Sequence, residues 1–224
     1  MTVTWLPYGC ASPVLSCWRA DYSGWFDPEL AAQFGVVSID WANNENSWRS
    51  KSLPYPDQAD LVTQAKMIKA ASMNRTKVFV YRQGQGAGSP AGKQATELLT
   101  NPIYDGFFLK SIGGAGALPA GTRIGGTFDF RNETLIDYFI NDYVGGPDCI
   151  ANPYVDGWFA DDVYGLGSPG SPDRTPTVKQ SGLSPDQVGA WNTGQQKAVV
   201  GAQNLVRMAA EPALCQLSSS LLMY

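Results

Sequence analysis

The sequence predicts an α/β fold, a TIM-barrel-like (β/α)8 domain that is incomplete or truncated at its C-terminus. Apolar, β-branched runs alternate several times with helical segments, which is the pattern of parallel strands joined by crossover helices. The long loops follow strands, and no nucleotide-binding glycine motif follows any of them, so a barrel is favoured over an open sheet. The chain has 224 residues, fewer than the roughly 250 of a full barrel, and we treat it as one domain.

The predicted elements follow one another along the chain in a strand–helix order. The first 27 residues are dense in turn residues and aromatics and are predicted to be a loop-rich segment, followed by a short helical turn that Asp27 caps. Strands are predicted where β-branched and aromatic residues cluster between turn residues. These are residues 34–42, 76–83, 125–132 and 154–163.

Helices are predicted where apolar residues recur at a spacing of three or four positions. The last and longest one has Ser184 at its N-cap and Pro185 at its first position, which is a typical helix start. The predicted helices are residues 57–74, 93–99, 133–144 and 184–210.

Composition narrows the possible chemistry. The net charge is −4 and no Lys/Arg cluster occurs, so we expect no nucleic-acid partner. No apolar run reaches the roughly 18 residues of a membrane span. The chain contains no histidine, which excludes Ser-His-Asp and Cys-His catalysis and removes the commonest metal ligand. We therefore expect neither a metal nor a cofactor, and any catalysis must use carboxylates, tyrosines, Arg or Lys.

The cysteines and glycosylation sequons favour an oxidising compartment. Cys10 and Cys17 lie seven positions apart in a segment rich in turn residues, where a local disulfide is plausible. Asn74 and Asn132 each begin an N-x-T sequon. The N-terminus lacks the basic start and apolar core of a secretory signal. The expectation is an extracellular protein, or one of the secretory-pathway lumen, whose signal peptide is not part of this chain.

Polar residues occur where each predicted strand ends. In a parallel barrel these ends meet at one mouth, so their carboxylates would share a cleft with nearby aromatic rings. Paired carboxylates can divide the roles of acid and base, and aromatic faces suit sugar rings, so the pattern indicates glycoside hydrolysis. The polar strand-end residues are Asp40, Tyr81 with Arg82, Asp129, and Asp161 with Asp162.

One stretch carries a family resemblance. The segment VDGWFADDV (155–163), with FDFRN (128–132) upstream, resembles the D-G-x-F-x-D signature of glycoside-hydrolase-like TIM barrels related to endo-α-1,4-polygalactosaminidase. The likeness covers residues 34–164 in strand order and is specific only over the nine-residue motif. It implies that Asp161 points into the mouth and that Asp129 comes from the preceding strand. A weaker likeness to chitinase-type barrels lacks the acid Glu, because Val163 stands there, so a chitinase mechanism is not expected.

These observations predict a carbohydrate-active hydrolase with Asp129 and Asp161 as its catalytic carboxylates. The predicted substrate-binding residues are Asp40, Trp41, Tyr81, Asp162 and Tyr164. Some of these residues also have a possible structural role, since Asp162 can cap the turn after the strand. Tyr81 and Arg82 point to opposite faces of their strand, so only one of them can reach the mouth.

A second hypothesis is a catalytically inactive barrel that serves as a glycan-binding or structural subunit of a larger assembly. A barrel open at one edge would offer unpaired strand groups to a protein partner. The sequon at Asn132, three residues after Asp129, favours this hypothesis, since a glycan there would crowd the mouth.

Overall fold

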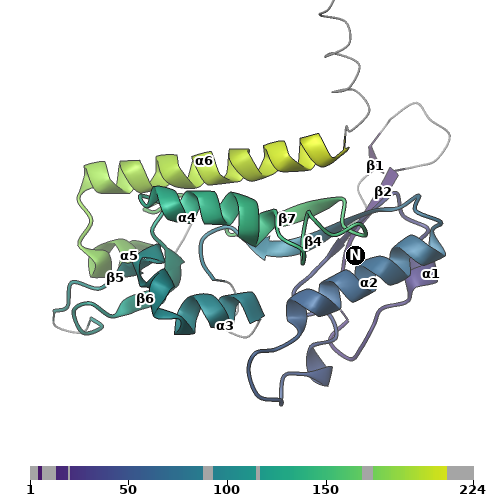
Figure 1. Ribbon diagram of the computed structural model, residues 1–224, viewed down its shortest axis with the longest axis horizontal. Helices are drawn as coiled ribbons and strands as arrows, with labels where there is room; N and C mark the ends of the chain where they lie inside the picture. The colour runs from purple at the N-terminus through teal and green to yellow at the C-terminus, as the bar shows by residue number, and fades with distance from the viewer. Residues whose placement is uncertain are drawn as a thin grey trace, which may run out of the picture.

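The computed structural model describes residues 5–6, 14–19, 21–87, 93–114, 117–167 and 174–210, and its centre is a twisted, mainly parallel sheet (Figure 1). The sheet has the strand order β1-β2-β3-β4-β7. β2, β3, β4 and β7 pair in parallel, and β1 pairs with β2 in antiparallel orientation. Its strands are β1 (Trp5–Leu6), β2 (Val14–Arg19), β3 (Val36–Ile39), β4 (Lys77–Gln83) and β7 (Gly157–Asp161).

A second sheet and the helices complete the described chain. β5 (Phe108–Lys110) and β6 (Arg123–Phe128) form an antiparallel pair. The α-helices are α1 (Pro28–Ala31), α2 (Asp57–Ala71), α3 (Lys93–Thr100), α4 (Glu133–Tyr138), α5 (Arg174–Ser181) and α6 (Pro185–Ala210). The short 3-10 helices are η1 (Glu45–Ser47) and η2 (Pro102–Phe107), and α4 continues into a π-helical turn, η3 (Phe139–Val144).

The prediction of a TIM-barrel-like (β/α)8 fold is wrong. Among the described residues the main sheet is open, with β1 and β7 as its edge strands, and β7 pairs directly with β4. The reason lies between those two strands. There the chain forms the antiparallel β5–β6 pair, which adds no parallel strand to the sheet. The chain is an α/β protein, but the strands between β4 and β7 belong to a separate sheet.

The backbone of β6 approaches the main sheet very closely. Gly86, just after β4, forms an antiparallel bridge with Thr127 of β6. A Cβ atom on Gly86 would lie 2.6 Å from the carbonyl oxygen of Gly126, so only glycine fits there. This contact directs β6 back against the end of β4 instead of alongside it, which the strand–helix alternation of the sequence does not reveal.

The N-terminal segment also differs from the prediction. Residues 1–27 were predicted to be loop-rich, but they contain β1 and β2. β2 pairs along its length with β3 and is therefore part of the main sheet. The short run of mixed residues in β2 carries no clear alternation, which explains why the pattern did not identify it.

One face of the main sheet packs against α2. Leu61, Ala65 and Ile68 of α2 are fully buried, as are the β4 residues Val78 and Val80. Alternate residues of β4 on the other face are only half-buried. Figure 1 shows α6 lying along α4, while the β5–β6 pair with α3 and α5 occupies one end of the molecule and α1 with α2 the other.

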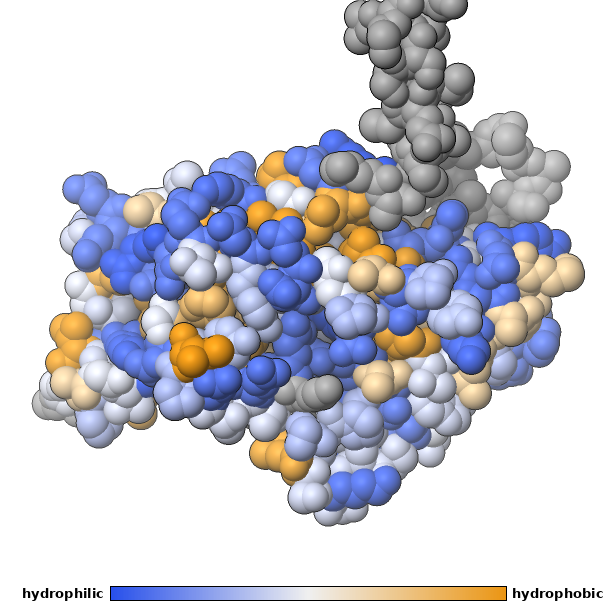
Figure 2. Space-filling view, in the orientation of Figure 1, coloured by the Kyte–Doolittle hydropathy of each residue, from blue (hydrophilic) through white to orange (hydrophobic). Residues whose placement is uncertain are grey.

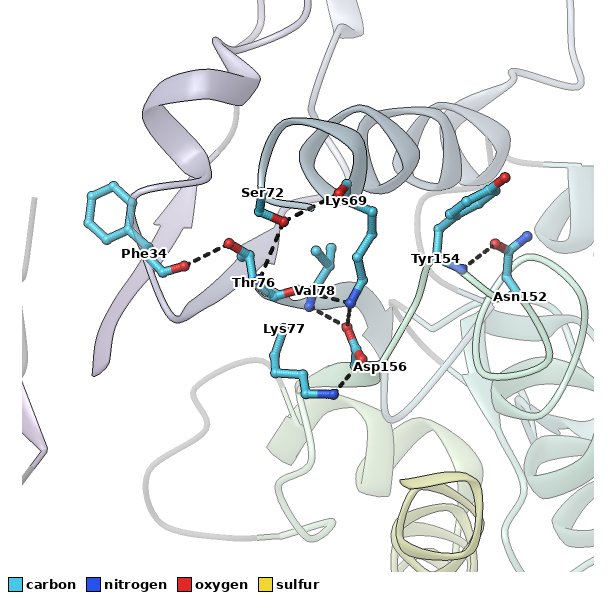
Figure 3. Close-up of polar contacts among 9 residues, drawn as sticks. All are labelled: Phe34, Lys69, Ser72, Thr76, Lys77, Val78, Asn152, Tyr154 and Asp156. Atoms are coloured by element: carbon cyan, nitrogen blue, oxygen red, sulfur yellow. Dashed lines mark hydrogen bonds and ion pairs between the residues drawn. The ribbon is translucent and has the colours of Figure 1, made fainter. Parts of the chain in front are cut away.

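The amino ends of β4 and β7 are joined by the Asp156 carboxylate (Figure 3). Asp156 accepts a hydrogen bond from the backbone N–H of Val78 at 2.8 Å and forms ion pairs with Lys69 of α2 and with Lys77, the latter at 3.0 Å. Lys69 is buried and also donates to the Thr76 carbonyl at 2.9 Å. These contacts hold the pKa of Asp156 below its usual range although burial opposes the shift. Asp156 is therefore a structural residue just before β7, at the edge of the sheet opposite the carboxyl ends of its parallel strands.

The surface facing the viewer in Figure 2 is largely hydrophilic. Hydrophobic residues appear on it as separate small patches and not as one continuous apolar face. Among the described residues, no helix combines the length and the apolar character needed to cross a membrane.

Candidate functional site

The carboxyl ends of β3, β4 and β7 bring three of the sequence-predicted residues together. Asp40 directly follows β3, Tyr81 lies on β4, and Asp161 is the last residue of β7. Because the three strands are parallel neighbours, their ends meet at one edge of the sheet. Gln83 pairs with Asp161 in the strand register, and Tyr81 lies two residues before Gln83 on the same face of β4.

Asp40 is a buried acid whose neighbours oppose its ionisation. Its side chain is 8% exposed, and Oδ1 accepts a hydrogen bond from the backbone N–H of Ala42 at 2.9 Å. Burial raises the pKa of Asp40, and the negative charges of Asp161 and Glu45 raise it further, while the bond from Ala42 acts in the opposite direction. Asp161 is thus close enough for its charge to act on Asp40.

Tyr81 links β4 to this carboxylate pair. Its hydroxyl donates a hydrogen bond to Asp161, and burial together with the charges of Asp161 and Asp162 raises the pKa of Tyr81 above its usual value. The phenol is therefore protonated at neutral pH and can donate to the Asp161 carboxylate. Its ring lies beside that of Phe159 on β7, with 6.3 Å between the ring centroids.

The two adjacent acids at the end of β7 have different roles. Asp162 adopts a left-handed backbone conformation with φ of 53°, which Asp tolerates better than most residues. Its carboxylate accepts a hydrogen bond from the Gln83 side chain at 2.7 Å, and its backbone N–H donates to Oδ1 of Asp161 at 2.8 Å. Asp162 turns the chain out of the strand and fixes the orientation of Asp161.

Asp129 lies apart from these residues. It follows β6 in the second sheet, and its carboxylate forms a two-point ion pair with the Arg131 guanidinium, with distances of 2.8 and 2.7 Å. The two residues line a surface depression of about 300 Å³ together with residues of β5 and the segment after α5. The Asp129 carboxylate also accepts a hydrogen bond from the backbone N–H of Arg131 at 3.2 Å, and the Asp129 N–H donates to the Phe107 carbonyl at 2.8 Å.

A small cavity lies behind the strand ends, on the α2 side of the sheet. It has a volume of about 20 Å³, room for about one water molecule, and is lined in part by Trp41, Asp57 and Arg82. Arg82 is 3% exposed and donates to the carbonyls of Tyr81 and Asp148, while its Nε has no partner. Arg82 thus faces away from Tyr81, as the alternation of a strand requires.

Asp57 is a buried acid that the sequence analysis did not single out. It lies in the first turn of α2, a position where an acid is usually exposed, so the sequence offers no signal for its burial. Burial raises the pKa of Asp57 to about 6, although the nearby Arg82 guanidinium lowers it.

The remaining predicted residues are Tyr164, the two sequon asparagines and the two cysteines of the predicted disulfide. Tyr164, in the loop after β7, is 54% exposed, and its carbonyl accepts a hydrogen bond from the Gln85 side chain. Both sequon asparagines end a helix or begin one: Asn132 caps α4 with its side chain, and Asn74 takes a left-handed conformation after α2. Of the predicted disulfide, Cys10 and the side chain of Cys17 lie outside what the structure describes.

Comparison with known proteins gives no assignment. No protein-family model matches the chain, and no curated protein matches it. Within the described part of the chain, no group of three or more Cys, Asp or Glu side chains is arranged to hold a metal ion.

Proposed function

We propose that the chain is a carbohydrate-active hydrolase that acts at the carboxyl ends of β3, β4 and β7, with Asp40 and Asp161 as its carboxylate pair. The observation that carries this proposal is the placement of Asp40 and Asp161 at the same edge of the sheet, with Asp40 buried and its pKa raised by that burial and by the nearby charge of Asp161. Hydrolysis of a glycoside requires one protonated and one ionised carboxyl group, and two acids whose environments differ in this way can supply both.

The roles follow from the environment of each group. Asp40 donates its proton to the glycosidic oxygen as the bond to the leaving sugar breaks. The Asp161 carboxylate acts on the anomeric side, where it attacks the carbon or takes a proton from the attacking water. Tyr81 orients Asp161 through its hydrogen bond, while the substrate-binding role of Trp41, which lines the small cavity on the α2 side of the sheet, stays a prediction from the sequence.

Asp40 is preferred to Asp129 as the partner of Asp161. The pairing of Asp129 with Asp161 stays a prediction from the sequence motif. Asp129 follows β6 in the second sheet, and its carboxylate is already held at two points by the Arg131 guanidinium. An extracellular location and glycans at Asn74 and Asn132 likewise stay predictions.

Purified protein assayed on a panel of aryl glycosides and oligosaccharides tests the proposal. We expect turnover of at least one substrate, and we expect Asp161→Asn to reduce kcat/KM by about 100-fold or more while circular dichroism shows an intact fold. Absence of turnover on the whole panel would reject the proposal in favour of the inactive, glycan-binding or structural subunit. Full activity of folded Asp161→Asn would also reject it.

A further inference from the structure

Exposed aromatic side chains gather at the edge of the sheet that carries the carboxylates. Within the part of the chain whose side chains the structure describes, the aromatic residues most open to solvent are Tyr22, Trp25 and Tyr164, at 56%, 37% and 54% exposure. Tyr22 and Trp25 lie in the loop after β2, and Tyr164 lies in the loop after β7. The faces of exposed aromatic rings suit the C–H surfaces of sugar rings, so these three residues are candidates for binding a carbohydrate.

The loop after β2 is held firmly against the end of β3. The carbonyl of Asp21 accepts from the backbone N–H of Asn44, and the carbonyl of Tyr22 accepts from that of Asn46, both at 2.8 Å. The Asp21 side chain accepts from the N–H of Ser23 at 2.9 Å, which fixes the turn. Tyr22 is thus presented by a hydrogen-bonded loop next to the site, and a ring held in this way loses little entropy on binding.

The loop after β7 is fixed in a similar way on the other side. Gln85 binds the carbonyl of Tyr164, and the N–H of Leu166 donates to the Asn192 side chain of α6 at 2.7 Å. The ring of Tyr164 is therefore carried by a loop that is attached both to the main sheet and to α6.

The order of the strands places Asp40 between these two loops and Asp161 at the start of the loop after β7. β3 and β4 separate β2 from β7, so the ends of β2 and β7 are three strand spacings apart, roughly 14 Å. That distance is longer than one sugar ring. We propose that Tyr22 and Trp25 on one side, and Tyr164 on the other, are stacking platforms for an extended glycan chain that lies across the strand ends and passes over Asp40 and Asp161.

This assignment rests on the proposed function for the class of ligand, but its test does not require turnover. The full chain is run through native gels that contain hydroxyethylcellulose, arabinoxylan, galactomannan or polygalacturonate, and the retardation gives the affinity. We expect at least one polymer to retard the protein, and we expect Tyr22→Ala and Tyr164→Ala each to weaken that binding about two- to tenfold. Ile103→Ala, which removes an apolar side chain that is 73% exposed on η2, should bind like the wild type.

The outcomes separate the platforms from the catalytic proposal. If no polymer retards the wild type, or if both tyrosine variants bind as tightly as Ile103→Ala, the platform assignment is overturned, even where aryl glycosides are hydrolysed. If the polymers bind through the tyrosines but nothing is hydrolysed, the platforms stand and the hydrolase proposal falls.

Discussion

At the scale of single residues, the end of β7 shows how two neighbouring acids acquire different tasks. The strand stops between them, so Asp161 stays in the register of β4 while Asp162 leaves it with a positive φ. Strand-end position alone predicted that Asp40, Tyr81 and Asp161 would gather at one edge, and the structure places them there. The same argument does not extend to Asp129, because its strand belongs to the other sheet.

The buried acid Asp57 gives the protein a pH-dependent stability. Its pKa is raised from 3.8 to about 6, so between these values the folded state binds more protons than the unfolded state. The stabilising contribution is present below about pH 4 and is lost as the pH rises to about 6, and it amounts to about 2 to 3 kcal/mol. We expect Asp57→Asn to remove this contribution to the decrease in stability between pH 4 and 6. The measurement is the free energy of unfolding, obtained by urea denaturation from pH 4 to 7.

A matched variant controls for the loss of any acid from a helix start. Asp186→Asn removes an exposed acid from the first turn of α6 and should leave the fall in stability between pH 4 and 6 in place. If the free energy of unfolding of Asp57→Asn decreases between pH 4 and 6 as much as that of the wild type, Asp57 is not the group responsible.

At the scale of elements, α6 fixes the second sheet through small residues and one tryptophan. Trp191 is fully buried and donates to the Phe128 carbonyl at 2.8 Å, at the end of β6. Its ring meets that of Phe130 edge to face, with 5.3 Å between the centroids. The helix was predicted from its cap and periodicity, but its partner strand was misplaced, because periodicity shows which residues are buried and not what covers them.

Two glycines of α6 provide a test of this packing. A Cβ atom on Gly194 would overlap the carbonyl oxygen of Phe130, whereas one on Gly189 would meet nothing within 4 Å. We expect Gly194→Ala to lower the free energy of unfolding by about 1 to 3 kcal/mol through overpacking. Gly189→Ala should be neutral or stabilise by up to about 1 kcal/mol, because alanine favours a helix. Equal stability of the two variants in urea denaturation would contradict the close contact between α6 and the Phe130 backbone.

At the scale of the whole molecule, the sequence predicted the α/β class and most elements of the chain, but not their connections. Strands near 34–42, 76–83 and 154–163 appear as β3, β4 and β7 and are parallel, but β4 pairs directly with β7, whereas the predicted barrel placed the strand at 125–132 between them. The barrel was wrong because strand–helix alternation is common to open sheets and closed barrels. In this chain the open sheet is distinguished from a barrel by the backbone contact between Gly86 and β6. In the sequence, the only sign of that contact is the glycine itself.

The open sheet changes which carboxylates share a site. In a barrel, the end of the predicted strand at 125–132 would lie beside that of β7, and Asp129 would be the natural partner of Asp161. In the observed order, β4 lies next to β7 and β3 next to β4, so Asp40 takes that place. We therefore propose that Asp40 and Asp161, and not Asp129, form the catalytic pair.

The most direct test is a comparison of kcat/KM for Asp40→Asn, Asp161→Asn and Asp129→Asn on the best substrate of the glycoside panel, with folding checked by circular dichroism. We predict that the first two variants lose about 100- to 10,000-fold, because each removes a group that transfers a proton or acts on the anomeric carbon. Asp129→Asn should stay within about threefold of the wild type, a loss well below that of removing an acid–base catalyst. A folded Asp40→Asn variant with normal activity, or an Asp129→Asn variant as inactive as Asp161→Asn, would contradict the account.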